Sequence, residues 1–187
     1  LLVRGKYKEA RDKARMALEY DLHSPIIRSN IAYVSYYTHD FKQAADEARA
    51  ALRIFPYFQR ANTYLAYALE QLGHYDEAIV NFAEGGDKSA AAYRDTPGGK
   101  WEEFLKSKEK LQRNPPDGEK IQYYDLAETA ARLGKAEEAL IHLRQAIDQR
   151  SNRVVFIGTN PRFKKLCGER FLELVREVKV PAKICGE

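Results

Sequence analysis

The sequence predicts an all-α protein, a solenoid of antiparallel helix pairs with a capping helix at its C-terminal end. The first observation is a repeat: similar segments start at Gly5, His39 and Gly73, each 34 residues after the one before. The second observation is chemical, because every copy has an aromatic residue two positions after its start and an alanine three positions later. This period is typical of helix–turn–helix units that bury their apolar faces only by stacking on neighbours.

Four copies of the repeat are predicted, with an insertion between the third and the fourth. They lie near residues 1–24, 25–58, 59–87 and 119–152 of a single solenoid that spans 1–187. In the first three copies, helices are expected at about 6–20, 25–37, 41–53, 58–72 and 75–84. Because Gly5 already stands at a turn, we expect the first helix of the first copy to lie upstream and the chain to be a fragment of a longer protein.

The insertion begins where Gly85 and Gly86 end a helix, since paired glycines weaken a helix and accept the left-handed conformation at its end. One inserted helix follows at about 99–113. Its Trp101 and Phe104 are three residues apart and share one helical face, which favours packing over ligand binding. The fourth copy then predicts helices at about 119–133 and 136–149.

The segment 153–187 departs from the repeat and is predicted to be a C-terminal cap. Pro161 begins a short helical turn, a position where proline is well tolerated. An apolar stripe follows at helical spacing, which would cover the open end of the last repeat, as terminal caps must. The stripe consists of Phe163, Leu166, Phe171, Leu174 and Val178.

Small residues complete the repeat pattern in the first helix of three copies, at Ala32, Ala66 and Ala127. Together with the turn residue, the aromatic residue and the alanine of the second helix, they make the chain resemble the tetratricopeptide repeat family. Pro56 stands where that family usually ends a repeat. The resemblance implies stacked helix pairs that enclose a superhelical groove suited to holding other polypeptides.

The end of the chain is similar to the repeat regions attached to bacterial winged-helix transcriptional regulators. In those regions the last repeat runs into an arginine–serine pair, an apolar run, Pro-Arg-Phe, a leucine and a second phenylalanine. The matching residues here are Arg150-Ser151, 154–157, Pro161-Arg162-Phe163, Leu166 and Phe171. The resemblance implies a regulatory or sensing region that contacts DNA only through a domain upstream of this chain.

A groove for a protein or peptide partner is predicted on the first helices of the second and third copies. Tyrosine supplies a large contact area at low entropic cost and keeps a polar tip, so several tyrosines on one helical face favour binding. For Tyr36 a place in the core and a place in the groove both remain open. The predicted groove residues are Tyr33, Tyr36, Tyr37, Arg60, Tyr67 and Gln71.

A protein- or peptide-binding scaffold is therefore the favoured function, and two alternatives stay open. One is a stand-alone assembly adaptor. The other is nucleic-acid binding through the basic tail, because residues 150–187 contain nine lysines and arginines against four acidic residues. Arg170, Glu173, Arg176 and Glu177 alternate in sign at helical spacing, which favours a solvated helix over a phosphate-binding patch.

Catalysis is not expected, because the chain has no glycine-rich phosphate loop, HExxH or Gly-x-Ser-x-Gly motif and its four histidines are scattered. No cofactor or metal is predicted. Cys167 and Cys185 lack partners at metal-ligand spacing and are expected to be free thiols, which favours a reducing, cytoplasmic compartment. No run approaches the roughly 18 apolar residues of a membrane-spanning helix.

Overall fold

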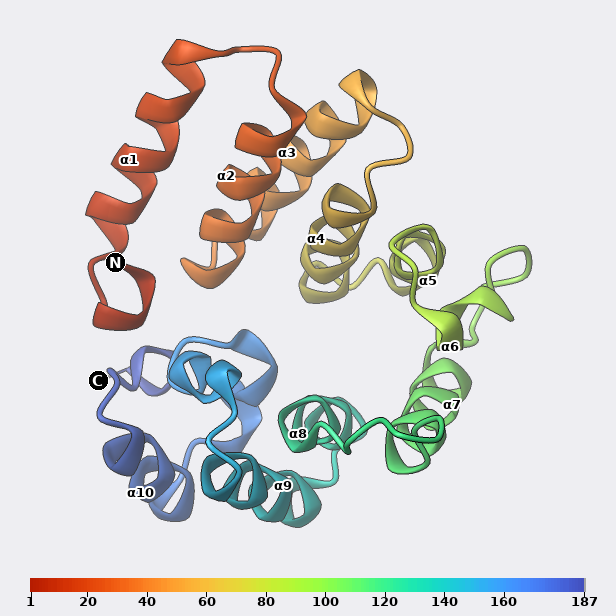
Figure 1. Ribbon diagram of the computed structural model, residues 1–187, viewed down its shortest axis with the longest axis vertical. Helices are drawn as coiled ribbons and strands as arrows, with labels where there is room; N and C mark the ends of the chain where they lie inside the picture. The colour runs from red at the N-terminus through yellow and green to blue at the C-terminus, as the bar shows by residue number, and fades with distance from the viewer. Residues whose placement is uncertain (187) are drawn as a thin grey trace. The chain divides into compact units, whose positions relative to one another are not determined.

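The computed structural model describes residues 1–186, and within them it is helical with no β-strand (Figure 1). Each predicted helix is present, with ends that differ by a few residues from those expected. The α-helices are α1 (Tyr7–Tyr20), α2 (Pro25–Tyr37), α3 (Phe41–Ile54), α4 (Gln59–Gln71), α5 (Tyr75–Glu84), α6 (Lys88–Ala91), α7 (Trp101–Arg113), α8 (Tyr123–Arg132), α9 (Ala136–Asp148) and α10 (Glu169–Val178). Short 3-10 helices are η1 (Leu2–Arg4), η2 (Asn152–Phe156), η3 (Pro161–Leu166) and η4 (Lys183–Cys185).

The same turn recurs between helices, and its geometry explains the repeat signal in the sequence. His39, Gly73 and Gly134 all have positive φ, at 64°, 82° and 76°. In each case the next backbone N–H donates to the carbonyl five residues earlier, as in the bond from Asp40 N to Ser35 O. A residue in the left-handed region ends the first helix and lets its last carbonyls find donors before the second helix starts.

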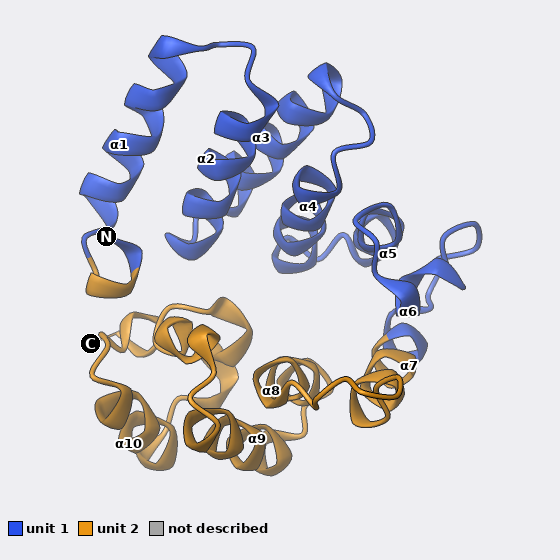
Figure 2. Ribbon diagram, in the orientation of Figure 1, with its two compact units in different colours: residues 1–2, 6–104 blue, residues 3–5, 105–187 orange. Residues whose placement is uncertain are grey.

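The chain divides into two compact units, shown in different colours in Figure 2. Unit 1 contains residues 1–2 and 6–104, and unit 2 contains residues 3–5 and those from 105 onward. The division falls inside α7, between Phe104 and Leu105. The single solenoid over 1–187 that the sequence predicts stays a prediction.

In unit 1 each helix from α1 to α5 packs on the next one in the chain, and α2 also packs on α4. Small residues allow this close approach, because Ala32, Ala44, Ala66 and Ala78 have no exposed surface. These are the alanines that define the repeat in the sequence. The predicted packing role of the inserted helix is also confirmed: Phe104 is fully buried and its ring centroid lies 5.5 Å from that of Trp101.

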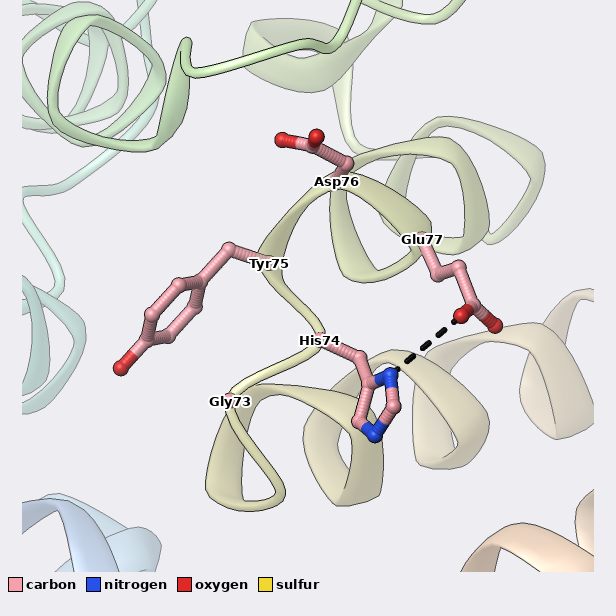
Figure 3. Close-up of a pocket in the computed structure, with 5 residues that line it drawn as sticks. All are labelled: Gly73, His74, Tyr75, Asp76 and Glu77. Carbon is pink, nitrogen blue, oxygen red and sulfur yellow. Dashed lines mark ion pairs between the residues drawn. The ribbon is translucent and has the colours of Figure 1, made fainter.

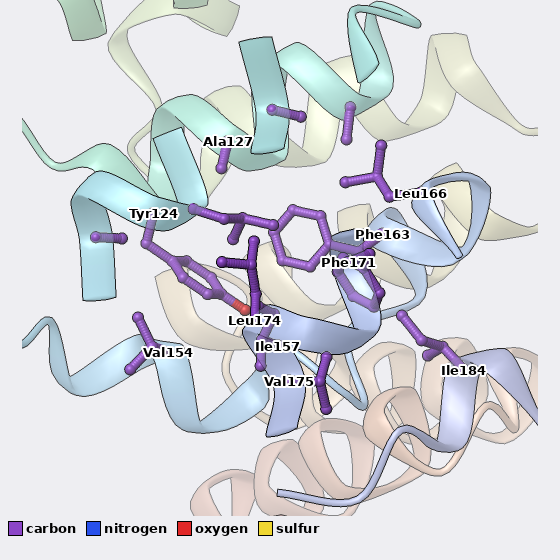
Figure 4. Close-up of a cluster of buried hydrophobic side chains, with 14 of the residues drawn as sticks. Tyr124, Ala127, Val154, Ile157, Phe163, Leu166, Phe171, Leu174, Val175 and Ile184 are labelled. Atoms are coloured by element: carbon purple, nitrogen blue, oxygen red, sulfur yellow. The ribbon is translucent and has the colours of Figure 1, made fainter. Parts of the chain in front are cut away.

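In unit 2, the C-terminal segments η3 and α10 pack on α8 and α9 around one hydrophobic cluster (Figure 4). Tyr124, Phe163 and Phe171 are almost completely buried in it. Four residues of the predicted stripe (Phe163, Leu166, Phe171 and Leu174) are buried, and Val178 packs against the cluster as a partly buried residue. The apolar run before Pro161 forms η2, which the sequence pattern did not predict.

The expectation of two free thiols is wrong, because Cys167 and Cys185 form a disulfide with a Cα–Cα distance of 5.6 Å. The backbone turns back after α10 at Lys179, whose φ is 59°, and this reversal brings the two cysteines together. Sequence spacing alone does not reveal such a reversal. Disulfides are typical of oxidising compartments, so the two cysteines give no support to the predicted cytoplasmic location.

Candidate functional site

The six residues predicted to line a groove lie on two packed helices of unit 1, α2 and α4. Tyr36 and Tyr37 are packed inside the unit, with 0% and 6% of their surface exposed. Tyr33 and Tyr67 are half-buried, and Arg60 is exposed. Gln71, the last residue of α4, is also half-buried.

The four predicted tyrosines form one connected group of rings. The ring centroids of Tyr33 and Tyr37 are 5.1 Å apart, and those of Tyr36 and Tyr37 are also 5.1 Å apart. Tyr36 then reaches from α2 to Tyr67 on α4, at 5.4 Å. These distances are within the range in which aromatic pairs stabilise packing. Arg60 and Gln71 take no part in these ring pairs.

Sequence reasoning missed Tyr64, which lies between the half-buried tyrosines. Its ring centroid is 5.4 Å from that of Tyr33 and 6.0 Å from that of Tyr67. The guanidinium carbon of Arg60 lies 5.6 Å from the Tyr64 ring centroid. The signal was present in the sequence, because residues four apart on a helix are neighbours and arginine stacks on aromatic faces. We call Tyr33, Arg60, Tyr64 and Tyr67 the tyrosine face.

The phenol of Tyr33 stays protonated over the physiological pH range. Burial raises the pKa of Tyr33 to about 12, the neighbouring Tyr64 adds to the rise, and the Arg60 guanidinium opposes it. A neutral phenol can both donate and accept a hydrogen bond. The tyrosine face therefore combines apolar ring surface with a neutral hydroxyl and an exposed cation.

The two helices that carry the tyrosine face contain few charged residues. Their charged residues are Arg28, Arg60 and Glu70, whereas α1 alone has seven. Arg28 pairs with Glu47 at 2.9 Å, and Glu70 is only 7% exposed. Arg60 is thus the one exposed charge on α2 and α4. Depletion of charge with enrichment of tyrosine and arginine is the composition found at the centre of protein–protein interfaces.

A separate hollow of about 310 Å³ is lined by the turn between α4 and α5, from Gly73 to Glu77 (Figure 3). His74 Nδ1 lies 3.4 Å from Glu77 Oε1. Asp76 accepts a hydrogen bond from the backbone N–H of Gly99 at 3.1 Å. Among residues 1–186, no group of three or more His, Cys, Asp or Glu side chains is arranged to hold a metal ion. We assign no chemistry to this hollow.

Two arginines of the basic tail are engaged inside unit 2. The Glu128 side chain accepts hydrogen bonds from Arg162 at 3.1 Å, from Arg153 at 3.1 Å and from Asn160 at 2.7 Å. Arg153 also pairs with Asp125. Glu128 and Arg162 are only 6% and 7% exposed, so these charges hold α8 to the segments that follow α9.

Two further arginines of the tail form ion pairs at the surface. Arg170 pairs with Glu137 at 2.6 Å, and Arg176 pairs with Glu169 at 2.8 Å. The cationic residues of the tail are therefore partly neutralised by neighbours, which weakens a phosphate-binding interpretation.

No helix within the described residues is long and apolar enough to cross a membrane.

The chain matches no protein-family model, and no curated protein is found similar to it.

Proposed function

We propose that this chain is a helical-repeat scaffold that binds a protein or an extended peptide at the tyrosine face of unit 1. The observation that carries the proposal is a connected group of half-buried tyrosines on two helices that have a single exposed charge, Arg60. Residues of these types contribute most of the binding energy in protein interfaces.

The packing beneath the tyrosine face supports a preformed site. The Tyr33 ring lies against the buried Tyr37, and the Tyr67 ring lies against the buried Tyr36 and Phe82. Side chains held in this way lose little rotamer freedom when a partner binds, which favours affinity. A peptide would place apolar side chains on the rings and hydrogen-bonding or anionic groups near Arg60 and Gln71.

The proposal includes the tetratricopeptide-repeat arrangement and the regulatory role that the sequence resemblance implies. Support for the repeats comes from the recurring left-handed turns and from the buried alanines at equivalent positions. In a bacterial transcriptional regulator, the tyrosine face would receive the signal or partner, and a domain upstream would contact DNA. A stand-alone assembly adaptor would use the same face, so the two differ in what precedes this chain.

Nucleic-acid binding through the tail is the less favoured alternative. Arg153 and Arg162 are held by Glu128, and Arg170 and Arg176 have carboxylate partners. Lys164 and Lys165 are exposed and are the residues through which such binding is best tested. We propose no catalytic step, cofactor or metal for the chain.

A peptide-display selection tests the proposal without knowledge of the natural partner. A library of random 12-residue peptides is selected on the chain, and the strongest binder is titrated against variants. We expect Tyr64→Ala and Arg60→Glu each to weaken binding at least about tenfold, the effect of losing an interface anchor. The matched controls are Tyr20→Ala and Tyr57→Ala, because these tyrosines are 84% and 81% exposed elsewhere in unit 1.

Peptide titration together with a DNA-binding assay separates peptide binding at the tyrosine face from nucleic-acid binding by the tail. Peptide binding that survives both tyrosine-face variants would overturn the proposed site. Salt-sensitive binding of random duplex DNA that is lost in Lys164→Glu/Lys165→Glu would support the nucleic-acid alternative instead, because phosphate contacts release counterions.

A further inference from the structure

The last residues of the chain form a strap across unit 2. After α10 ends, residues 179–186 run back over the hydrophobic cluster and include the short helix η4. Ala182 and Ile184 of this strap are each only 6% exposed and belong to the same cluster as Phe163 and Phe171. Lys179 and Lys183 of the strap are exposed.

Gly158 is the point on which the strap rests. The backbone N–H of Ile184 donates to the Gly158 carbonyl at 3.1 Å. A Cβ atom added at Gly158 would lie 2.0 Å from the carbonyl oxygen of Pro181, which is backbone and cannot rotate away. Close approach of the strap to the chain beneath it therefore requires glycine at this position.

The disulfide supplies the second attachment of the strap. It joins Cys185, in η4, to Cys167, the residue that follows η3. Cys167 is an exposed residue and Cys185 is half-buried, so a thiol in solution can approach the bond from the Cys167 side. Exposed disulfides of this kind are the ones that react most readily in thiol exchange.

The noncovalent contacts of the strap are mostly apolar. Ala182 and Ile184 are buried in the cluster, Val180 and Cys185 pack against it, and the backbone N–H of Ile184 donates to Gly158. Ordering each residue of the strap costs conformational entropy. The disulfide offsets much of that cost, because it joins cysteines 18 residues apart and so restricts the conformations of the unfolded chain as well. Reduction of the bond leaves the strap held by its noncovalent contacts alone.

We propose that the strap is a redox-controlled element, docked on Gly158 when the disulfide is formed and released when it is reduced. Release withdraws Ala182 and Ile184 from the cluster and uncovers the apolar surface beneath them. This role is independent of the tyrosine face, which lies in unit 1.

The redox step requires a dithiol reductant. One thiolate of the dithiol attacks Sγ of Cys167 and forms a mixed disulfide, and Cys185 leaves as a thiolate that takes up a proton. The second thiol of the reductant then attacks the reductant's sulfur atom in the mixed disulfide, which releases Cys167 as a thiol. Two electrons pass to the protein, the dithiol becomes a disulfide, and the reverse exchange docks the strap again.

Hydrogen exchange of the Ile184 amide tests the proposal, since this amide donates to Gly158 only while the strap is docked. The whole chain is compared with and without dithiothreitol. We expect the Ile184 amide to exchange at least tenfold faster after reduction, while amides of α8 and α9 keep their protection. Equal protection of Ile184 in both states would overturn the proposal. Simultaneous loss of protection in α8 and α9 would also overturn it, because the strap would then not move as a separate element.

Two variants make the test independent of the reductant. Cys167→Ser/Cys185→Ser is expected to show the fast exchange of the reduced chain in both conditions. Gly158→Ala is expected to release the strap even with the disulfide intact, because the added methyl group occupies the place of the Pro181 carbonyl. If Ile184 remains protected in the double serine variant, noncovalent contacts alone hold the strap and the disulfide is not a switch.

Discussion

The two units use the same residue types in opposite ways. In unit 1, Tyr33 and Tyr67 are half-buried and Arg60 is exposed beside them. In unit 2, Tyr124 is 1% exposed, its hydroxyl accepts a hydrogen bond from Asn160 at 3.2 Å, and Arg162 is held by buried Glu128. Aromatic and cationic side chains therefore do not mark a binding surface by themselves. A surface is indicated where they lie together at partial exposure with few charged neighbours.

The sharpest way to test this contrast is to remove the buried carboxylate of unit 2. Glu128→Ala removes one member of a buried ion pair with Arg162, and loss of one member of such a pair typically costs about 3–5 kcal/mol of stability. The free energy of unfolding from urea titration measures it, with Glu137→Ala as the control. Glu137 pairs with Arg170 at the surface, where such pairs contribute less than about 1 kcal/mol. Equal effects of the two variants would contradict a structural role for the buried network.

A smaller loss of stability is expected from overpacking the helix contact of unit 1. Ala44 has no exposed surface where consecutive helices meet, so Ala44→Leu forces the helices apart and costs about 1–3 kcal/mol. Thermal unfolding measures the change, and Lys42→Leu, at an exposed position of the same helix, is the control. An unchanged melting temperature in Ala44→Leu would show that the helix contact tolerates a larger side chain.

A pH-dependent effect is expected from Glu109 in unit 2. Burial raises the pKa of the Glu109 carboxyl, but hydrogen bonds from Lys135 and Arg113 outweigh it and hold the pKa below its ordinary value of 4.5. A depressed pKa in the folded state means that Glu109 stabilises the fold at pH 7 and that this contribution is lost as pH falls below 4.5. Urea unfolding at pH 7 and in acid should show a weaker pH dependence for Glu109→Gln. If Glu109→Gln and the unchanged chain lose the same stability in acid, Glu109 does not make this pH-dependent contribution.

The smallest effect is expected at the turn between α2 and α3. His39 has a left-handed backbone, at a φ of 64°, where the equivalent turns use Gly73 and Gly134. His39→Gly removes the steric cost of that conformation and is expected to add up to about 1 kcal/mol of stability. Gly73→Ala is expected to lose a similar amount, and chemical denaturation of both variants checks the two signs. If His39→Gly destabilises the chain, the stacking of the His39 ring on Phe41 contributes more than relief of the left-handed backbone conformation.

Local signals in the sequence predicted the helices well, because they depend on residues close in the chain. The turn glycines and the periodic alanines are of this kind. The buried places of Tyr36 and Tyr37 depend on how α4 packs on α2, so periodicity within α2 alone left Tyr36 open. Tyr64 was missed because only the positions expected to face inward were considered.

Features that join distant parts of the chain were beyond the sequence pattern. Glu128 and Arg162 are 34 residues apart and meet because η3 packs on α8. The cysteines meet because the chain reverses after α10. Neither pair has a local spacing that predicts contact, since both depend on the tertiary path of the backbone.

Mapping of backbone amide shifts on the isotope-labelled protein tests whether the tyrosine face of unit 1 binds a polypeptide. A peptide selected on the chain is added to the isotope-labelled protein, and the shifted amides are assigned. We expect the shifts to concentrate on α2 and α4, around the four residues of the tyrosine face, and Arg60→Glu to remove them. Shifts centred on Lys164 and Lys165, with α2 and α4 unchanged, would contradict binding at the tyrosine face.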